Sequence, residues 1–274
     1  MPILRLKRKM RHIKRMHRVE RDQTGSSYLV SPLRAAIRRN DTQEALRLVK
    51  SKRKYPDIEE GCTNLHLAIR NCPNLELIQL LLEGRSVEII DFASKRFENK
   101  NAMLEAALYA NAIIIDHLAR AGANVRVKDE KGRSPFYLTV MHGAFCANSD
   151  NPPSAYPAVL AAAKTLARHG ALDALQSPKE MTLLRDYVDK NLGARFPPDT
   201  NLITWLTSEG LDPGGYRIAP EHWLAQEYVK KLIGVVYEAV QCGITLRRLA
   251  MQRALHPNFN ENHEILLSLL GDYV

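Results

Sequence analysis

The feature of this sequence that most restricts its fold is a short apolar pattern that occurs five times. It reads SPLRAAI at 31–37, TNLHLAI at 63–69, AMLEAAL at 102–108, SPFYLTV at 134–140 and TLLRDYV at 182–188. Each copy has a large apolar residue at its third position: Leu33, Leu65, Leu104, Phe136 and Leu184. Such recurrence indicates a repeat protein, in which each repeat buries its apolar face only by packing on its neighbours.

A second recurring mark is a glycine that ends a later apolar stretch in each repeat. These glycines are Gly84, Gly122, Gly170 and Gly210. Because glycine accepts positive φ, it suits the position that follows the last turn of a helix. Each repeat is therefore predicted to contain a turn, a helix, a short connection, a second helix and a terminal glycine.

The clearest junction between turn and helix is DEKGRSPF at 129–136. Asp129 can close a turn with its carboxylate, and Gly132 can supply a positive φ. Ser134 is a good N-cap, and Pro135 fits the first helical position, where its missing N–H costs nothing. This stretch is predicted to be the start of a helix and not a catalytic turn.

These segments resemble ankyrin repeats, whose consensus begins DxxGxTPLHxA and later reads LLxxGAD. The matching segments are DEKGRSPFYL at 129–138, GCTNLHLA at 61–68, LLLEG at 80–84 and LARAGAN at 118–124. The resemblance covers roughly residues 30–213 and implies an all-α ankyrin-repeat solenoid of helix–turn–helix units with connecting fingers. The family's structural histidine, which bonds backbone across the turn, is present only as His66. The other repeats carry Arg34, Glu105, Tyr137 and Arg185 at that position.

The repeat pattern also predicts the organisation of the chain. We expect a basic arm at 1–27, an ankyrin-repeat domain at 28–243 with five clear repeats, and a separate segment at 244–274. A degenerate sixth repeat is predicted at 216–243, because Leu224 and Gly243 have the same spacing as Leu65 and Gly84. Residues 230–233, where its connection would fall, read instead as continuous helix.

The positive charge of the chain is concentrated in the arm. The formal net charge is +9, yet residues 1–21 hold nine Lys or Arg and one acid, which gives 9 − 1 = +8 for the arm. The remainder is nearly neutral, which argues against a basic surface over the whole domain. The arm is basic and amphipathic. It could be an import signal, a mitochondrial presequence, a contact for nucleic acid, anionic lipid or calmodulin, or a solvated extension.

Candidate partner-binding residues follow from the ankyrin resemblance, since ankyrin repeats bind mainly through their fingers and first helices. At those positions stand Lys95, Arg96, Arg126, Lys128, Glu130, Arg133 and Tyr137. An insertion at 143–157, predicted from its prolines to be an extended loop, adds Phe145 and Tyr156 as aromatic anchors. The alternative is that the charges reflect solvent exposure alone and the insertion is a tolerated surface loop.

Residues 244–274 resemble a SOCS box, whose first half reads (S/T)LxxxCxxxΦ. The corresponding residues are Thr245, Leu246, Leu249 and Ala254, although Ala250 replaces the family cysteine and the later Leu-Pro motif is absent. The resemblance implies docking on Elongin C and a role as substrate receptor of a cullin-type ubiquitin ligase. The alternative is a helical cap that seals the last apolar face of the repeats.

Motifs for chemistry are absent from the sequence. It contains no GxxxxGK[ST], no GxGxxG after a strand, no HExxH and no GxSxG, so we expect no enzyme, cofactor or metal. An enzyme site in the diverged region 214–274 is the least favoured alternative. The four cysteines form no CxxC pair, and no apolar run approaches ~18 residues. We therefore expect reduced thiols and an intracellular protein, in the cytoplasm or nucleus.

Overall fold

The computed structural model describes residues 18–21, 27–51, 55–146, 152–172, 182–191, 198–211 and 227–255. They belong to two compact blocks. The N-terminal block contains Met1–Pro135 with Arg168–Gly170, and the C-terminal block contains Phe136–Ala167 with Ala171–Val274. The arm at 1–17 lies outside the described residues, so its amphipathic helix stays a prediction.

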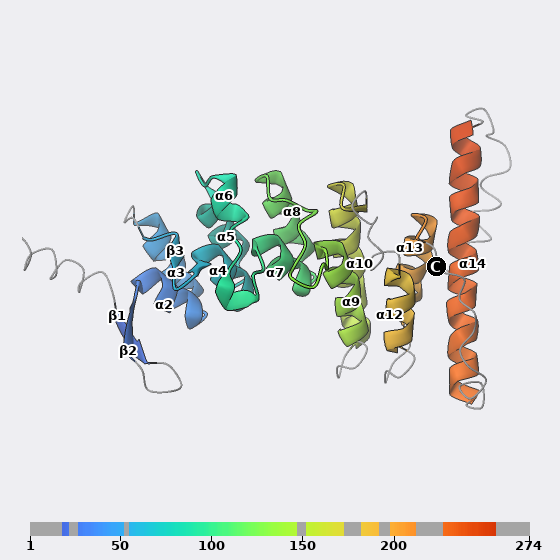
Figure 1. The fold of residues 1–274 in the computed structure, drawn as a ribbon, viewed down its shortest axis with the longest axis horizontal. Helices are drawn as coiled ribbons and strands as arrows, with labels where there is room; N and C mark the ends of the chain where they lie inside the picture. Colours follow the sequence, from blue (N-terminus) through green and yellow to red (C-terminus); the bar gives the residue numbers. More distant parts are fainter. Residues whose placement is uncertain are drawn as a thin grey trace, which may run out of the picture. The chain divides into compact units, whose positions relative to one another are not determined.

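The N-terminal block is built from pairs of antiparallel helices (Figure 1). The pairs are α2 (Pro32–Arg38) with α3 (Thr42–Lys50), α4 (Asn64–Asn71) with α5 (Leu75–Leu82), and α7 (Ala102–Leu108) with α8 (Ala112–Arg120). First helices pack on first helices and second helices on second helices, in the order α2–α4–α7 and α3–α5–α8. A short helix α6 (Val87–Ile90) and a 3-10 turn η1 (Lys95–Phe97) occupy the longer connection between α5 and α7.

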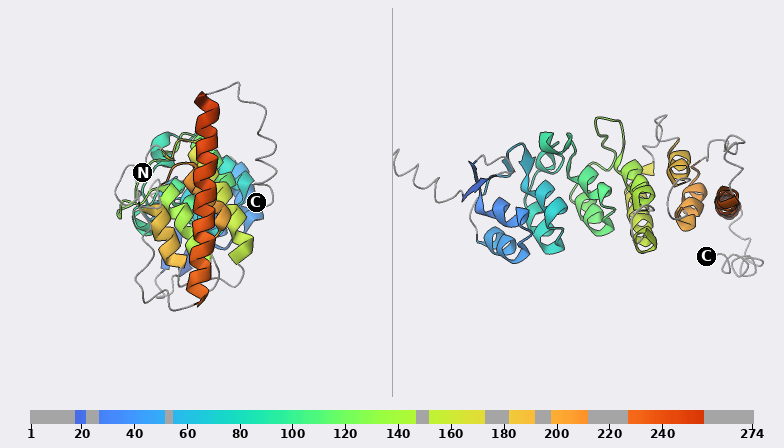
Figure 2. Two further views of the ribbon diagram at one scale, coloured as in Figure 1. Left: turned by 90° about the vertical axis from the view of Figure 1, so that its right-hand side faces the viewer. Right: turned by 90° about the horizontal axis from the view of Figure 1, so that it is seen from below.

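The C-terminal block continues the same pattern and then departs from it. It contains α9 (Pro135–Cys146), α10 (Pro152–Arg168), α12 (Leu183–Asn191), α13 (Thr200–Ser208) and the long helix α14 (Glu227–Leu255). Helix α14 packs along α13, and Figure 2 shows it as one uninterrupted helix. The fold class is therefore the all-α ankyrin-repeat solenoid that the sequence predicts.

The repeat marks found in the sequence have the predicted roles. All five apolar anchors are buried, from Leu65 at 4% exposure to Leu104 and Phe136 at 0%. The four terminal glycines have φ between +66° and +96°. At the DEKGRSPF junction, Asp129 Oδ1 accepts from the N–H groups of Lys131 and Arg133, at 2.9 Å each. Gly132 has φ +73°, and α9 begins at Pro135.

Two short antiparallel strand pairs were not predicted. Strand β1 (Arg18–Arg21) pairs with β2 (Ser27–Val30), with Arg18 opposite Val30. Strand β3 (Ile58–Glu59) pairs with β4 (Cys62–Thr63) around a two-residue turn. In that turn Glu60 and Gly61 both have positive φ, +54° and +71°, as a type I′ hairpin requires.

The insertion at 143–157 is not the extended loop that its prolines predicted. Helix α9 runs to Cys146 and α10 begins at Pro152, so only 147–151 lie outside the described residues. Pro152 and Pro153 occupy the first turn of α10, where proline is tolerated because those N–H groups have no helical partner. The insertion therefore lengthens two helices.

The predicted boundary at Gly243 is not a helix end, because α14 continues through it to Leu255. A Cβ added at Gly243 would lie 2.5 Å from the carbonyl oxygen of Thr204 and 2.6 Å from Cβ of Thr207. Gly243 is thus needed where α14 and α13 approach closely, and not as a helix terminator. No connection interrupts α14 at 230–233, as the sequence of those residues predicted. The first part of the predicted sixth repeat, 216–226, lies outside the described residues, so that repeat stays a prediction.

Exchanging the two glycines of α14 for alanine tests this packing role. Gly243→Ala should destabilise the protein by about 1–3 kcal/mol, since α14 must move away from α13. Gly234→Ala is the matched control: a Cβ there meets nothing within 4 Å, so the better helix former should stabilise by about 0.5–1 kcal/mol. The measurement is urea denaturation of both variants. Equal effects of the two substitutions would contradict the close approach at Gly243.

Candidate partner-binding surfaces

His66 joins the second repeat to the third, as the ankyrin resemblance implied. Its Nε2 lies 3.0 Å from the carbonyl oxygen of Lys100, and its Nδ1 lies 2.7 Å from Oγ1 of Thr63. A carbonyl only accepts, so Nε2 carries the proton and Nδ1 accepts from the threonine hydroxyl. The ring is fully buried, and this burial lowers the pKa of His66 to about 4.

Arg34 makes the equivalent connection one repeat earlier. The sequence showed Arg34 only as a replacement of the family histidine and did not predict this bond. His66 stands three residues after the N-cap Thr63, and Arg34 stands three residues after the N-cap Ser31. The Nη1 of Arg34 donates to the carbonyl of Cys62 at 3.2 Å. The side chain is completely buried. Arginine therefore replaces histidine without loss of the bond, because both are donors long enough to reach the next finger.

The buried arginine belongs to a cluster centred on Glu60. Arg38 and Arg96 both bond to Oε2 of Glu60, the latter at 2.7 Å, and Nε of Arg34 lies 3.7 Å from the same oxygen. The carboxylate of Glu59, on β3, accepts from the N–H of Ser31 at 3.1 Å. Glu60 thereby connects residues of three successive repeats.

We use the name finger row for residues 57–63, 91–101 and 124–134, the turns that precede α4, α7 and α9. Neighbouring fingers are bonded to one another. Ser94 Oγ donates to the carbonyl of Gly61 at 2.9 Å, and Asn99 donates to the carboxylate of Glu130. Together with the ion pair between Arg96 and Glu60, these bonds make the fingers of the N-terminal block one connected surface.

The structure places the predicted finger residues in two groups. Those that are exposed on the finger row are Lys95, Arg96, Arg126, Lys128 and Glu130. Arg133 is half-buried, and its Nε bonds to the carboxylate of Asp129 in the same turn at 2.8 Å. Its guanidinium therefore maintains the turn, and its role as a partner contact stays a prediction.

The aromatic candidates belong to the C-terminal block. Tyr137 on α9 is half-buried, and its hydroxyl donates to Oδ2 of Asp186 on α12 at 3.3 Å. Tyr156, also half-buried, lies on α10. The side chain of Phe145 lies outside the described residues. Tyr137 thus links two repeats, as Arg34 and His66 do, and is not a freely presented anchor.

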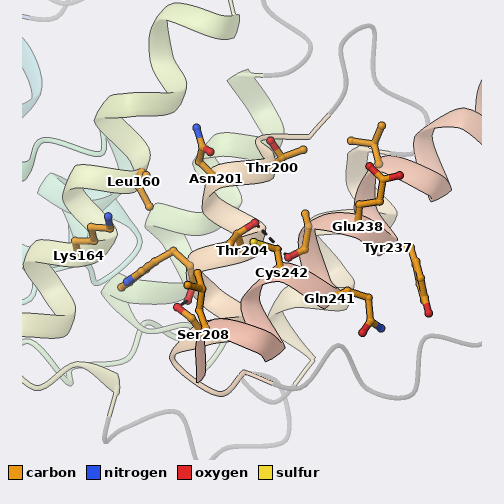
Figure 3. A pocket seen from close by; sticks show the side chains of 14 residues that line it. Leu160, Lys164, Thr200, Asn201, Thr204, Ser208, Tyr237, Glu238, Gln241 and Cys242 are labelled. Atoms are coloured by element: carbon orange, nitrogen blue, oxygen red, sulfur yellow. Dashed lines mark hydrogen bonds between the residues drawn. The ribbon is translucent and has the colours of Figure 1, made fainter. Parts of the chain in front are cut away.

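A groove of about 770 Å³ lies in the C-terminal block between α10, α13 and α14 (Figure 3). Leu160 and Lys164 of α10 form one side, and Tyr237, Gln241 and Cys242 of α14 the other. Thr204 lies on α13 between them, and its hydroxyl donates to the carbonyl of Ala239 at 3.2 Å. Nothing in the sequence pattern indicated this groove, because its walls come from three helices that are distant in sequence.

The residues matched to the SOCS box lie on α14 beside this groove. Leu246 lines the groove, and Leu249 is half-buried. Thr245 is exposed, and its hydroxyl donates to the carbonyl of Gln241 at 2.9 Å. The side chain of Ala254 lies outside the described residues.

Comparison with known proteins identifies the family. A family model for the ankyrin repeat matches residues 60–92, which contain β4, α4, α5, His66 and the Glu60 turn. Together with the repeated helix pairs, this match shows that the chain is an ankyrin-repeat protein, a class that serves as protein–protein interaction modules. A search of curated proteins found no match to the chain.

Two properties of the described residues bear on other classes of function. No helix among them combines the length and the apolar character needed to cross a membrane. In the same part of the chain, no three His, Cys, Asp or Glu side chains are grouped so that they could hold a metal ion.

The buried His66 predicts a loss of stability in mild acid. Its pKa falls from 6.5 to about 4 on folding, so the unfolded chain takes up a proton at a pH where the folded protein does not. The contribution of neutral His66 to the free energy of unfolding is fully present above pH 6.5. It decreases as the pH falls towards 4, by about 3 kcal/mol in total. Denaturation midpoints between pH 7 and 4 should show this decrease.

The comparison variant is His66→Asn, which is less stable at every pH but should lack this part of the slope. His142, whose pKa burial also lowers, contributes equally to both proteins and cancels in the difference. Identical pH slopes for the two proteins would contradict a neutral buried His66.

Replacing Arg34 tests its role as the substitute for the family histidine. Arg34→Met keeps most of the volume but removes the donor to the buried carbonyl of Cys62, and we expect a loss of about 1–3 kcal/mol. The control is Arg47→Met, where an exposed arginine pairs with Glu44 on the same helix and the loss should be about 0.5 kcal/mol or less. Thermal unfolding of both variants measures the difference, and equal effects would refute a structural role for Arg34.

Proposed function

We propose that this ankyrin-repeat protein is a non-enzymatic adaptor that binds a partner protein through its finger row and the 143–157 segment. The observation that carries the proposal is the bonding between fingers. Each finger is fixed to the next by a side chain, through Arg96 and Glu60, through Ser94 and Gly61, and through Asn99 and Glu130. A surface held in place before binding loses little conformational entropy when a partner docks.

The chemistry of the finger row favours a partner with a polar, charged surface. Lys95, Arg96 and Lys128 are exposed there beside the acidic Glu98 and Glu130. Interspersed charges of this kind contribute to orientation and specificity through complementary charges on the partner. Ile58, which is 40% exposed on β3, offers an apolar contact within the same surface.

The described parts of the 143–157 segment, which are the end of α9 and the start of α10, add a second part to the proposed surface. Helices α9 and α10 carry Phe145 and Tyr156 close to the connection between them. Aromatic residues of this type often supply the largest part of the binding energy at an interface. Their contribution is independent of the charges on the finger row, so the two can be tested separately.

The role as a ubiquitin-ligase receptor remains a separate hypothesis. Thr245 and Leu249 are accessible on α14, as a docking helix would need, whereas Leu246 faces the groove beside α13. Leu246→Asp would distinguish the possibilities. In a ligase receptor this substitution should abolish co-purification of Elongin C, and in a cap it should only lower stability.

The basic arm is proposed as a contact for an anionic partner, either nucleic acid, anionic lipid or an import receptor.

Charge reversal on the finger row tests the adaptor function. The double variant Lys95→Glu/Lys128→Glu should reduce recovery of the specific partner from cell extract at least about tenfold, since both charges are exposed at the tips of fingers. Quantitative affinity purification followed by mass spectrometry measures the recovery. The matched control is Lys190→Glu on α12, an exposed lysine outside the finger row, which should leave the partner set unchanged.

The aromatic pair Phe145→Ala/Tyr156→Ala is measured in the same experiment. Loss of the same partner in this variant would show that the binding surface includes Phe145 at the end of α9 and Tyr156 near the start of α10. Partner recovery equal to that of the unsubstituted protein in both double variants would reject the finger row and these two aromatic residues as the binding surface.

A further inference from the structure

Helix α14 uses one narrow face to pack on α13. Val236, Ala239, Val240 and Gly243 are buried, with the i, i+3, i+4, i+7 spacing of a single helical stripe. Other apolar side chains of the same helix remain uncovered: Val235 is 39% exposed, Tyr237 62% and Met251 57%. A terminal element of a repeat protein normally turns a polar face outwards, so α14 as described is incompletely covered.

The groove between α10, α13 and α14 lies beside this uncovered surface. Its volume of about 770 Å³ is in the range of roughly 300–1,000 Å³ that is typical of binding pockets. Leu160, Val235 and Leu246 supply apolar side chains to the lining, and Thr204 and Ser208 of α13 supply hydroxyl groups. The charged members of the lining are Lys164 and Glu238, one of each sign. A short apolar segment fits this lining better than a charged ligand would.

The chain itself carries such a segment after α14. Residues 265–270 read ILLSLL, which is five large apolar residues out of six. Residues 256–274 contain three acids, Glu261, Glu264 and Asp272, and no lysine or arginine. The last part of α14 has the opposite charge, with Arg247, Arg248 and Arg253 and no acid between them.

The distances along the chain allow this segment to return to the groove. From Leu255 back to Leu246 is nine helical residues, or about 14 Å at 1.5 Å per residue. Residues 256–263 can span up to about 27 Å when extended. A chain that reverses direction after Leu255 therefore reaches the groove, and it brings its acids past the arginines of α14.

We propose that residues 264–270 bind in the groove between α10, α13 and α14 and complete the cap of the repeat stack. The leucines cover the apolar walls that Leu160, Val235 and Leu246 present. The acids that flank them face the arginines at the end of α14. The occupant is thus a segment of the same chain. The inference does not depend on the finger row as the partner-binding surface.

Cys242 provides a direct probe of this binding, because it lines the groove and is half-exposed there. Cys62 and Cys72 are buried, at 0% and 1% exposure. In a full-length Cys146→Ser background, a thiol reagent such as DTNB should therefore modify only Cys242 in the folded protein. The rate of that single reaction reports whether the groove is covered.

The test compares two paired substitutions in the segment, Leu266→Asp/Leu269→Asp and Leu267→Asp/Leu270→Asp. At least one pair should raise the modification rate of Cys242 about tenfold or more, because burying a carboxylate against the apolar side chains of the groove is unfavourable. Ser268→Asp is the matched control in the same segment and should leave the rate within about twofold of the background protein, since it removes no apolar contact. Only one reactive thiol per chain, with an unchanged helical circular dichroism signal, establishes that each variant is folded.

A synthetic peptide of residues 260–274 gives a second, independent measurement. Added to the accelerated leucine variant, it should slow modification of Cys242 again, and a peptide with aspartate at the four leucine positions should not. Three results would overturn the proposal: unchanged rates in both leucine pairs, a Cys242 rate that rises on dilution, or protection that requires a co-purifying protein. The second would assign the groove to another copy of the chain, and the third to a partner such as Elongin C.

Discussion

The N-terminal block depends on one type of interaction, a buried side chain that reaches from a first helix to the backbone of the next finger. His66 supplies it between the second and third repeats, and Arg34 between the first and second. In both cases the acceptor is the carbonyl directly before the next N-cap residue, Cys62 before Thr63 and Lys100 before Asn101. A buried carbonyl without a donor is costly, so arginine can replace histidine in the first repeat because it also donates.

The donor that both side chains provide explains how the first repeat tolerates substitution of the histidine. Arginine at position 34 is longer than histidine, and its charge is balanced by Glu60 and Glu59. In the third repeat the N-cap is Asn101, so the residue three positions later is Leu104, which has no donor, and the sequence alignment that gave Glu105 is out of register by one residue. Glu105 is the next residue on α7. It is buried below Arg70 at 3.5 Å, and burial raises its pKa. The repeats have therefore diverged by exchanging one polar arrangement for another, and their helix pairs are retained.

The sequence was sufficient for features that a local pattern determines, and insufficient for those that depend on packing between distant segments. Apolar anchors, terminal glycines and the Asp129 turn are set by neighbouring residues, and their burial, φ angles and hydrogen bonds follow the prediction. The ion pair of Arg96 with Glu60 joins residues 36 positions apart, so the pattern showed Arg96 only as an exposed finger charge. The predicted role of Gly243 as a helix terminator was wrong for a related reason. A glycine spaced like a helix terminator was in fact required by the proximity of Thr204, a contact that no local spacing records.

The end of the described chain raises the question that every repeat protein must solve, which is how the last apolar face is sealed. Helix α14 covers part of that face, because its residues Val236, Ala239, Val240 and Gly243 pack against α13. Because the helix is straight and 29 residues long, while α13 has only 9, most of α14 extends past its support. Of the remaining apolar side chains, Val235 and Leu246 lie to one side of this buried stripe and Tyr237 and Met251 to the other, so packing on α13 alone cannot bury them all. An element in the groove beside Leu246 and Cys242 would cover the side of α14 that carries Val235 and Leu246.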